Sequence, residues 1–99
     1  MKTYELVPTN GRQSYGHKAV VHEDVDTKVL YSYATKVCYS VPQGGFKGFR
    51  IANIYDPEKK KLRRTTMNHI EDFLYQIGVY PEKPSDKQIL KDFAEAIDA

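Results

Sequence analysis

The sequence predicts an α+β fold in which an antiparallel β-sheet of four to five strands packs against two C-terminal α-helices. Residues 15–64 contain runs of alternating apolar and polar side chains, which are typical of strands. Residues 66–77 and 86–97 instead repeat apolar side chains at helical spacing. With a length of 99 residues and a hydrophobic content of 40%, we expect one globular domain, residues 1–99.

The expected strands alternate in polarity or are rich in β-branched and aromatic residues: 15–23, 28–41, 49–55 and 61–64. Asn10-Gly11 predicts a turn before the first of them. Residues 34–36 interrupt the second strand, either as a tight turn or as a bulge. Asp56 and Pro57 occupy the first two positions expected of a type I turn, which makes residues 61–64 a return strand.

The first helix is the clearest element. Thr65 or Thr66 is expected to cap its first turn, unless Asn68 and Glu71 form a capping box there. Gly78 is placed to end it in the left-handed conformation. One face carries an apolar stripe: Met67, Ile70, Phe73, Leu74 and Ile77. This stripe predicts a helix that covers the core of the sheet.

The second helix is expected to begin at a capping box formed by Ser85 and Gln88. Its apolar face consists of side chains at helical spacing: Ile89, Leu90, Phe93, Ala94 and Ile97. These residues predict that the helix continues to residue 97 and packs on the same core.

The formal net charge of +2 conceals an asymmetry. Residues 1–64 hold twelve Lys/Arg and six Asp/Glu, whereas residues 65–99 hold three Lys and seven Asp/Glu. This split favours a charged partner or head-to-tail self-association, but it also fits an unevenly charged surface. Cys38 is the single cysteine and is expected to be a buried thiol. Without a secretory signal or a long apolar segment, we expect a cytoplasmic protein with no membrane partner.

No motif indicates catalysis, a metal or a cofactor, so we expect a protein that is not an enzyme. The histidines His17, His22 and His69 lack metal-ligand spacing. Residues 44–48 are glycine-rich but lack the Gly-Lys-Ser/Thr ending of a phosphate loop. We interpret them as a flexible hairpin tip that exposes Phe46 to a partner.

The densest charge run, residues 59–64, could bind phosphates or could protect an edge strand from aggregation. The eight tyrosines suit core packing, protein interfaces or stacking on bases. The candidate partner-binding residues are cations and aromatics: Lys59, Lys60, Lys61, Arg63, Arg64, Tyr31, Tyr33, Tyr39, Phe46 and Arg50.

Residues 10–21 together with 30–37, and residues 65–74, resemble a family of small uncharacterised proteins encoded by bacteriophages and prophages. The resemblance covers about half of the chain and carries no catalytic signature. The chain departs from the family at residues 61–64, where the family usually has an aromatic residue and a serine. The resemblance implies a phage origin and, because small phage proteins often block host proteins, a host partner.

We therefore expect a non-enzymatic inhibitor or regulator that binds a host protein, for example a nucleic-acid-processing defence complex such as a CRISPR effector. The alternative is a small nucleic-acid-binding module that uses the basic, tyrosine-rich sheet face. A small enzyme is the third class, and it would require a cleft that brings a histidine near a carboxylate.

Overall fold

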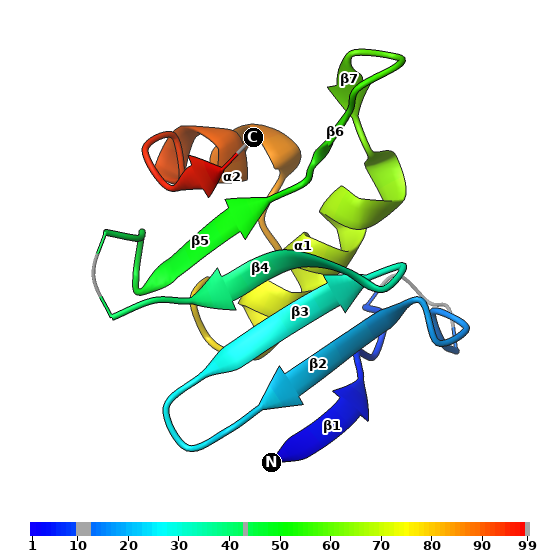
Figure 1. Ribbon diagram of the computed structural model, residues 1–99, viewed down its shortest axis with the longest axis vertical. Coiled ribbons are helices and arrows are strands. Elements are labelled where there is room, and N and C mark those ends of the chain that lie inside the picture. The colour runs from blue at the N-terminus through cyan, green and yellow to red at the C-terminus, as the bar shows by residue number, and fades with distance from the viewer. Residues whose placement is uncertain (10–12, 43, 99) are drawn as a thin grey trace.

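The computed structural model describes residues 1–9, 13–42 and 44–98 and has the predicted α+β fold. Six strands form the main sheet: β1 (Lys2–Glu5), β2 (Ala19–Glu23), β3 (Lys28–Ser32), β4 (Thr35–Ser40), β5 (Phe49–Ala52) and β8 (Ile97–Asp98). They lie in the order β1-β2-β3-β4-β5-β8 (Figure 1). Neighbouring strands are antiparallel except β5 and β8, which are parallel.

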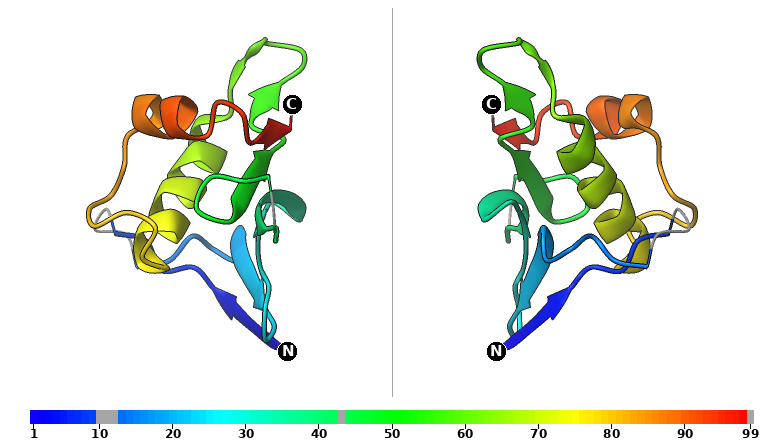
Figure 2. Two further views of the ribbon diagram at one scale, coloured as in Figure 1. Left: turned by 90° about the vertical axis from the view of Figure 1, so that its left-hand side faces the viewer. Right: turned by 90° about the vertical axis from the view of Figure 1, so that its right-hand side faces the viewer.

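A small second sheet and two helices complete the described structure. The second sheet is the hairpin of β6 (Tyr55–Asp56) and β7 (Lys61–Leu62), which projects beyond the main sheet (Figure 1). The helices are α1 (Arg64–Gln76) and α2 (Asp86–Asp92). Both helices lie on one side of the main sheet, and no described element covers the other side (Figure 2). The molecule therefore has two layers and one open sheet face.

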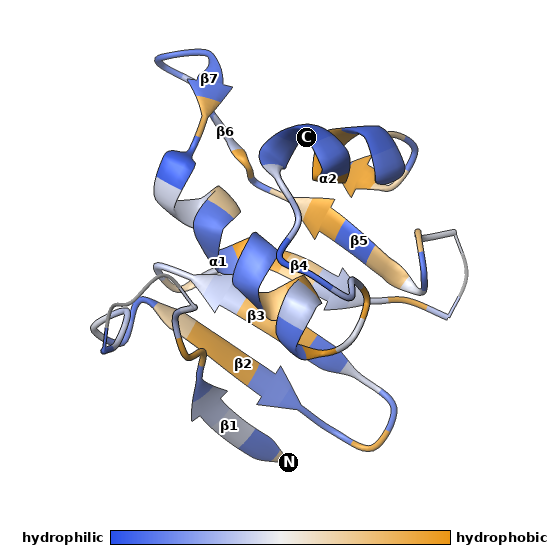
Figure 3. Ribbon diagram, turned by 180° about the vertical axis from the view of Figure 1, so that it is seen from behind, coloured by the Kyte–Doolittle hydropathy of each residue, from blue (hydrophilic) through white to orange (hydrophobic). Residues whose placement is uncertain are grey.

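The core lies between the sheet and α1, which crosses β3 and β4 (Figure 3). The apolar stripe of α1 supplies four fully buried side chains: Met67, Ile70, Phe73 and Leu74. From the strands, Val21, Leu30 and Ile51 are also fully buried and face this stripe. Burying each of these side chains contributes roughly 1.5–3 kcal/mol to folding. The prediction that the first helix covers the core is confirmed.

The predicted start of α1 is wrong, and its predicted end is confirmed. The helix begins at Arg64, with Arg63 as an N-cap that makes no side-chain capping hydrogen bond. Thr66 does not cap, because its hydroxyl group lies 3.1 Å from that of Ser32 inside the core. Gly78 has φ +87°, and the amide of Val79 donates to the carbonyl of Leu74 in the Schellman arrangement.

The second helix is shorter than predicted. Ser85 is its N-cap and accepts a hydrogen bond from the amide of Gln88, as expected, but the helix ends at Asp92. After it the chain turns back, and the carbonyl of Ala96 accepts from the amide of Ile51 at 2.9 Å. The sequence after Asp92 keeps a helical pattern, but Ile97 and Asp98 instead pair with β5 and cover an edge that would otherwise be open.

The junction of β3 and β4 contains both a tight turn and a bulge, the two alternatives that the sequence left open. Tyr33 and Ala34 have positive φ angles of 52° and 66°, which is the pattern of a two-residue type I′ hairpin. The register also shifts between Leu30 and Tyr31, so the strands contain a bulge. The turn therefore begins one residue earlier than the predicted interruption.

Several other strand boundaries differ from the predictions. The predicted strand at residues 15–23 begins only at Ala19, and β1 and β8 lie outside the predicted sheet range. The return strand is limited to β7, because the chain enters α1 directly after it. The predicted turn at Asn10-Gly11 lies outside the described residues.

Candidate binding surfaces

The open sheet face is lined by half-buried apolar and aromatic side chains. Successive residues of a strand point to opposite faces, so the neighbours of the core residues point outward here. These outward residues come from β2, β3 and β4: Val20, His22, Val29, Tyr31 and Tyr39. We call these five residues the open-face cluster. Two of its rings contact each other, since the centroids of His22 and Tyr31 are 4.7 Å apart.

Charged side chains border the open-face cluster. The Lys36 ammonium lies 4.2 Å from the ring centroid of Tyr39. Arg50 holds Asp98 through two hydrogen bonds, of 2.6 Å from Nη2 to Oδ1 and 3.0 Å from Nε to Oδ2, and the Tyr39 hydroxyl also donates to Asp98. These bonds, led by those from Arg50, lower the pKa of Asp98 to about 2. The bonds from Arg50 and Tyr39 to Asp98 therefore hold β8 at the edge of the main sheet.

A groove of about 290 Å³ lies between the β6–β7 hairpin and the start of α1. Its lining is rich in cations: Tyr33, Asp56, Lys59, Lys61, Leu62, Arg63, Arg64, Thr65 and Thr66. We call it the cationic groove. The hairpin positions Lys59 and Lys61, and the link to the helix positions Arg63, whose Nε donates to the carbonyl of Tyr55 at 3.3 Å.

A smaller polar pocket of about 160 Å³ adjoins the cationic groove. The two hollows share Tyr33, Arg63 and Thr66. The pocket is otherwise lined by β-strand and loop residues: Ser32, Thr35, Val37 and Asn53. The hydroxyl group of Ser32 lies 3.1 Å from that of Thr66 and 2.8 Å from Nδ1 of the buried His69. Buried hydroxyl groups therefore underlie the pocket.

The positive charge of the groove is only partly balanced. Within the described ranges, the structure records no ion pair for Lys59, Lys61 or Arg63. The carboxylate of Asp56 accepts from the backbone amides of Lys59 and Glu58, and these bonds lower its pKa. Asp56 thus closes the hairpin turn, and the charges of Arg63 and Lys59 also help to lower its pKa.

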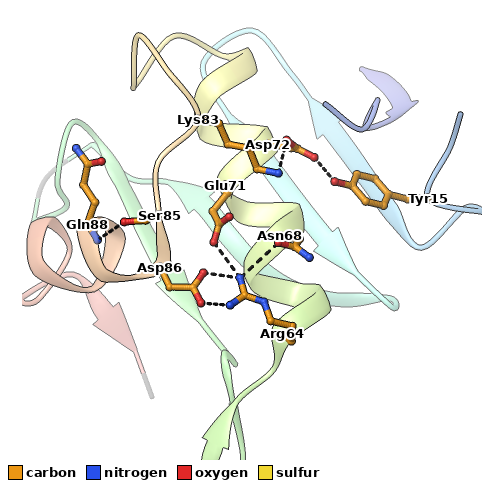
Figure 4. Close-up of polar contacts among 9 residues, drawn as sticks. All are labelled: Tyr15, Arg64, Asn68, Glu71, Asp72, Lys83, Ser85, Asp86 and Gln88. Carbon is orange, nitrogen blue, oxygen red and sulfur yellow. Dashed lines mark hydrogen bonds and ion pairs between the residues drawn. The ribbon is translucent and has the colours of Figure 1, made fainter. Parts of the chain in front are cut away.

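Arg64, by contrast, joins the two helices (Figure 4). Its guanidinium group donates to both carboxylate oxygens of Asp86, one at 2.7 Å, and to Glu71 at 3.3 Å. Burial, followed by the hydrogen bond and charge of Asp86, raises the pKa of Glu71 to about 8. Arg64 is therefore paired with Asp86 and Glu71, and it contributes less positive charge to the groove than the hairpin lysines do.

A second buried carboxylate, Asp72, lies on the adjacent side of α1 (Figure 4). It accepts hydrogen bonds from the hydroxyl groups of Tyr15 and Thr9, and the Lys83 ammonium lies 3.3 Å from its Oδ1. This arrangement compensates the charge inside the fold. It is a structural anchor for the N-terminal segment.

The structure distributes the candidate residues over two surfaces. Tyr31 and Tyr39 belong to the open-face cluster, and Arg50 borders it. The cationic groove gathers the second group: Tyr33, Lys59, Lys61, Arg63 and Arg64. Lys60 is exposed on the hairpin but does not line the groove.

Phe46 is not the exposed hairpin tip that the sequence predicted. Its ring centroid lies 5.0 Å from that of Phe93 and 6.4 Å from that of Tyr80. The loop folds back because an apolar ring gains more from packing beside α2 than from exposure to water. Phe46 therefore helps to hold the second helix.

The polar lining of the pocket was missed by sequence reasoning. Ser32 and Thr66 are nearly fully buried, at 2% and 4% exposure. Asn53 has a φ of 59° and donates to the carbonyl of Lys36 at 3.0 Å. The one available signal was a pair of small hydroxyl residues within otherwise apolar patterns.

The described residues contain no group of three His, Cys, Asp or Glu side chains that could hold a metal ion. Cys38 is fully buried, and burial raises the pKa of its thiol. No helix in the described part of the chain is long and apolar enough to cross a membrane.

Comparison with known proteins places the chain in a family. The model of a family of unknown function, DUF8033, matches residues 4–92. The chain belongs to this family. The matched span of the DUF8033 family includes the whole open-face cluster and the whole cationic groove. No curated protein and no solved structure matches the chain.

Proposed function

We propose that this chain is a non-enzymatic regulator that acts by binding another protein through its open sheet face. The composition of the open-face cluster carries this proposal. An antiparallel sheet that faces water on one side normally places polar residues there. Here Val20, Val29, Tyr31 and Tyr39 occupy neighbouring positions on that side.

The arrangement resembles the anatomy of protein interfaces. Such interfaces have an apolar, aromatic centre and a polar rim, and tyrosine is over-represented among their energetically dominant residues. The open-face cluster supplies the centre, while Lys36 and the Arg50–Asp98 pair supply the rim. Because neighbouring side chains already hold Tyr31 and Tyr39, little side-chain entropy is lost on docking.

The identity of the partner is part of the same proposal. The resemblance of residues 10–21, 30–37 and 65–74 to bacteriophage and prophage proteins supports a phage origin and action in the bacterial cytoplasm. A host defence protein that processes nucleic acid, such as a CRISPR effector, is the partner class we propose. A protein of this size can inhibit such a complex by occupying a surface rather than by catalysis.

Affinity purification with surface variants tests the proposal. The tagged chain is incubated with lysate of its host, with and without nuclease, beside Tyr31→Glu and Val29→Glu. Tyr75→Glu is the matched control, because Tyr75 is an exposed tyrosine on α1, away from the open face. Circular dichroism verifies that every variant is folded.

We expect one protein to be recovered in stoichiometric amount by the wild-type chain and by Tyr75→Glu, regardless of nuclease. Tyr31→Glu and Val29→Glu should lose it, because a buried carboxylate without a partner opposes docking. Retention of the same protein by both open-face variants would overturn the proposal. So would a wild-type homodimer that Tyr31→Glu dissociates, because a second copy would then cover the face.

A further inference from the structure

We propose that the cationic groove binds a single strand of nucleic acid, with phosphates against the hairpin cations and one base against Tyr33. This site is separate from the open-face cluster. It also differs from the sheet-face module expected from the sequence, because Tyr31 and Tyr39 do not line the groove.

The cations converge on one hollow although they come from different elements. Lys59 precedes β7, Lys61 lies in it, and Arg63 links it to α1. No carboxylate is paired with these three side chains in the described structure, whereas Arg64 has two acidic partners. Asp56 lines the same groove and interacts electrostatically with Arg63 and Lys59, so the three cations outnumber the one carboxylate. This excess of positive charge around a groove of about 290 Å³ attracts a polyanion and can contact successive phosphates.

Tyr33 supplies the aromatic wall from the first position of the two-residue turn between β3 and β4. It has a φ of 52°, although type I′ turns favour Asn, Asp or Gly at this position. Tyr33 is 52% exposed and lines both the groove and the polar pocket. Its ring centroid lies 6.0 Å from that of His69 and 5.7 Å from the Lys18 ammonium, so its exposed part is what remains for a ligand. An exposed aromatic residue in a strained turn at a hollow points to a functional contact. Stacking on a base is the contact that suits its ring.

The polar pocket offers hydrogen-bonding groups to the edge of a base that stacks on Tyr33. It adjoins the groove beyond Tyr33, and its lining includes two exposed polar residues, Thr35 and Asn53, beside the buried Ser32 and Thr66. Hydroxyl and amide groups can hydrogen-bond a base edge once the base is unstacked from its strand. A duplex offers no such base, and its phosphates alone would engage the cations. The arrangement therefore favours a single strand.

Fluorescence anisotropy tests the site directly. A short fluorescein-labelled oligothymidine is titrated with the intact chain at increasing salt, beside the same sequence as a duplex. The double variant Lys59→Ala/Lys61→Ala removes phosphate contacts, and Tyr33→Asn removes the ring while keeping a residue that suits the turn. Lys87→Ala/Lys91→Ala on α2 is the matched control, because these exposed lysines lie outside the groove.

We expect the wild-type chain to bind the single strand more tightly than the duplex. The logarithm of its association constant should fall with the logarithm of salt with a slope of about −2, as three phosphate contacts predict. The hairpin double variant should bind at least about tenfold more weakly and reduce the magnitude of this slope by about one or more. Tyr33→Asn should weaken binding about tenfold at every salt concentration without lowering the melting temperature.

The proposal would be overturned if the anisotropy did not change on titration at low salt. It would also be overturned if the α2 control lost as much affinity for the oligonucleotide as the hairpin double variant. Displacement of the oligonucleotide by polyglutamate as well as by unlabelled oligothymidine would also overturn it, because the groove would then recognise charge alone. Tyr31→Glu should bind the oligonucleotide normally. The protein-binding face and the nucleic-acid-binding groove can therefore fail independently, and the two experiments distinguish these outcomes.

Discussion

The hydroxyl group of Tyr15 donates a hydrogen bond to the carboxylate of Asp72, which is fully buried in the middle of α1. Thr9 donates to the same carboxylate, and Lys83 approaches it from the segment before α2. Residues far apart in the sequence thus meet at one buried charge. This relationship fixes the N-terminal segment to the helix that covers the core.

Replacing Tyr15 by Phe should lower the free energy of unfolding by about 1–3 kcal/mol, because the buried Asp72 carboxylate loses a donor that water cannot replace. Urea denaturation measures the change. Tyr75→Phe, at an exposed position on α1, should leave stability within about 0.5 kcal/mol. Equal stability of Tyr15→Phe and the wild type would show that the hydrogen bond adds nothing.

Glu71 should make the fold less stable as the pH rises. Its pKa is about 8 in the folded protein against 4.5 ordinarily, so the folded state holds the proton more tightly than the unfolded chain. Its stabilising contribution is therefore complete below pH 4.5 and is lost as the pH rises through about 8. Urea denaturation at a series of pH values should show this decline.

Glu71→Gln is the control for this decline, because the amide stays neutral and can still hydrogen-bond Asp86. The variant should be more stable than the wild type above pH 8, with a weaker dependence on pH. If the two proteins lose stability in parallel over this range, another group is responsible.

Phe73→Ala should cost about 3–5 kcal/mol of unfolding free energy, since a fully buried ring is replaced by a cavity. Its ring also contacts that of Phe49, with centroids 6.1 Å apart. A thermal melt provides the measurement. A melting temperature equal to that of the wild type would refute the role of this residue in the core.

Asp98→Asn should loosen β8, because the carboxylate joins Arg50 and Tyr39. The amide of Ile51, which donates to Ala96, should then exchange its hydrogen faster. In the wild type, the folded-state pKa of about 2 lies below the ordinary 3.8, so this contribution exists above pH 3.8 and is lost as the pH falls through 2. Asp26→Asn, in the exposed loop after β2, should leave this exchange rate unchanged.

The overall fold could be predicted because periodicity reports which side chains face a core. The apolar stripe of α1 and the alternation along β2 to β5 are periodic patterns of this kind, and Gly78 marks the end of α1 by its left-handed backbone. The end of α2 could not be predicted, since residues 93–97 keep a helical pattern and only the free edge of β5 redirects them. Local sequence does not show that edge.

The candidate surfaces were only partly predictable. The cations at residues 59–64 and the strand tyrosines are visible in the sequence, but their division between two surfaces depends on the projecting hairpin. The buried polar residues were missed because a polar residue in an apolar pattern is normally assigned to the surface. Asp72 and Thr66 are buried only because partners from distant segments satisfy them.

Site-specific photo-crosslinking tests the proposed protein-binding face most directly. A benzophenone amino acid is placed at position 31 in the open-face cluster or at position 75 on α1, and each tagged chain is irradiated in its host. Affinity purification first verifies that each labelled chain still recovers the host protein after nuclease treatment. We expect position 31 to give one dominant adduct with a host protein and position 75 to give none. Strong adducts from position 75 with none from position 31 would contradict binding through the open sheet face.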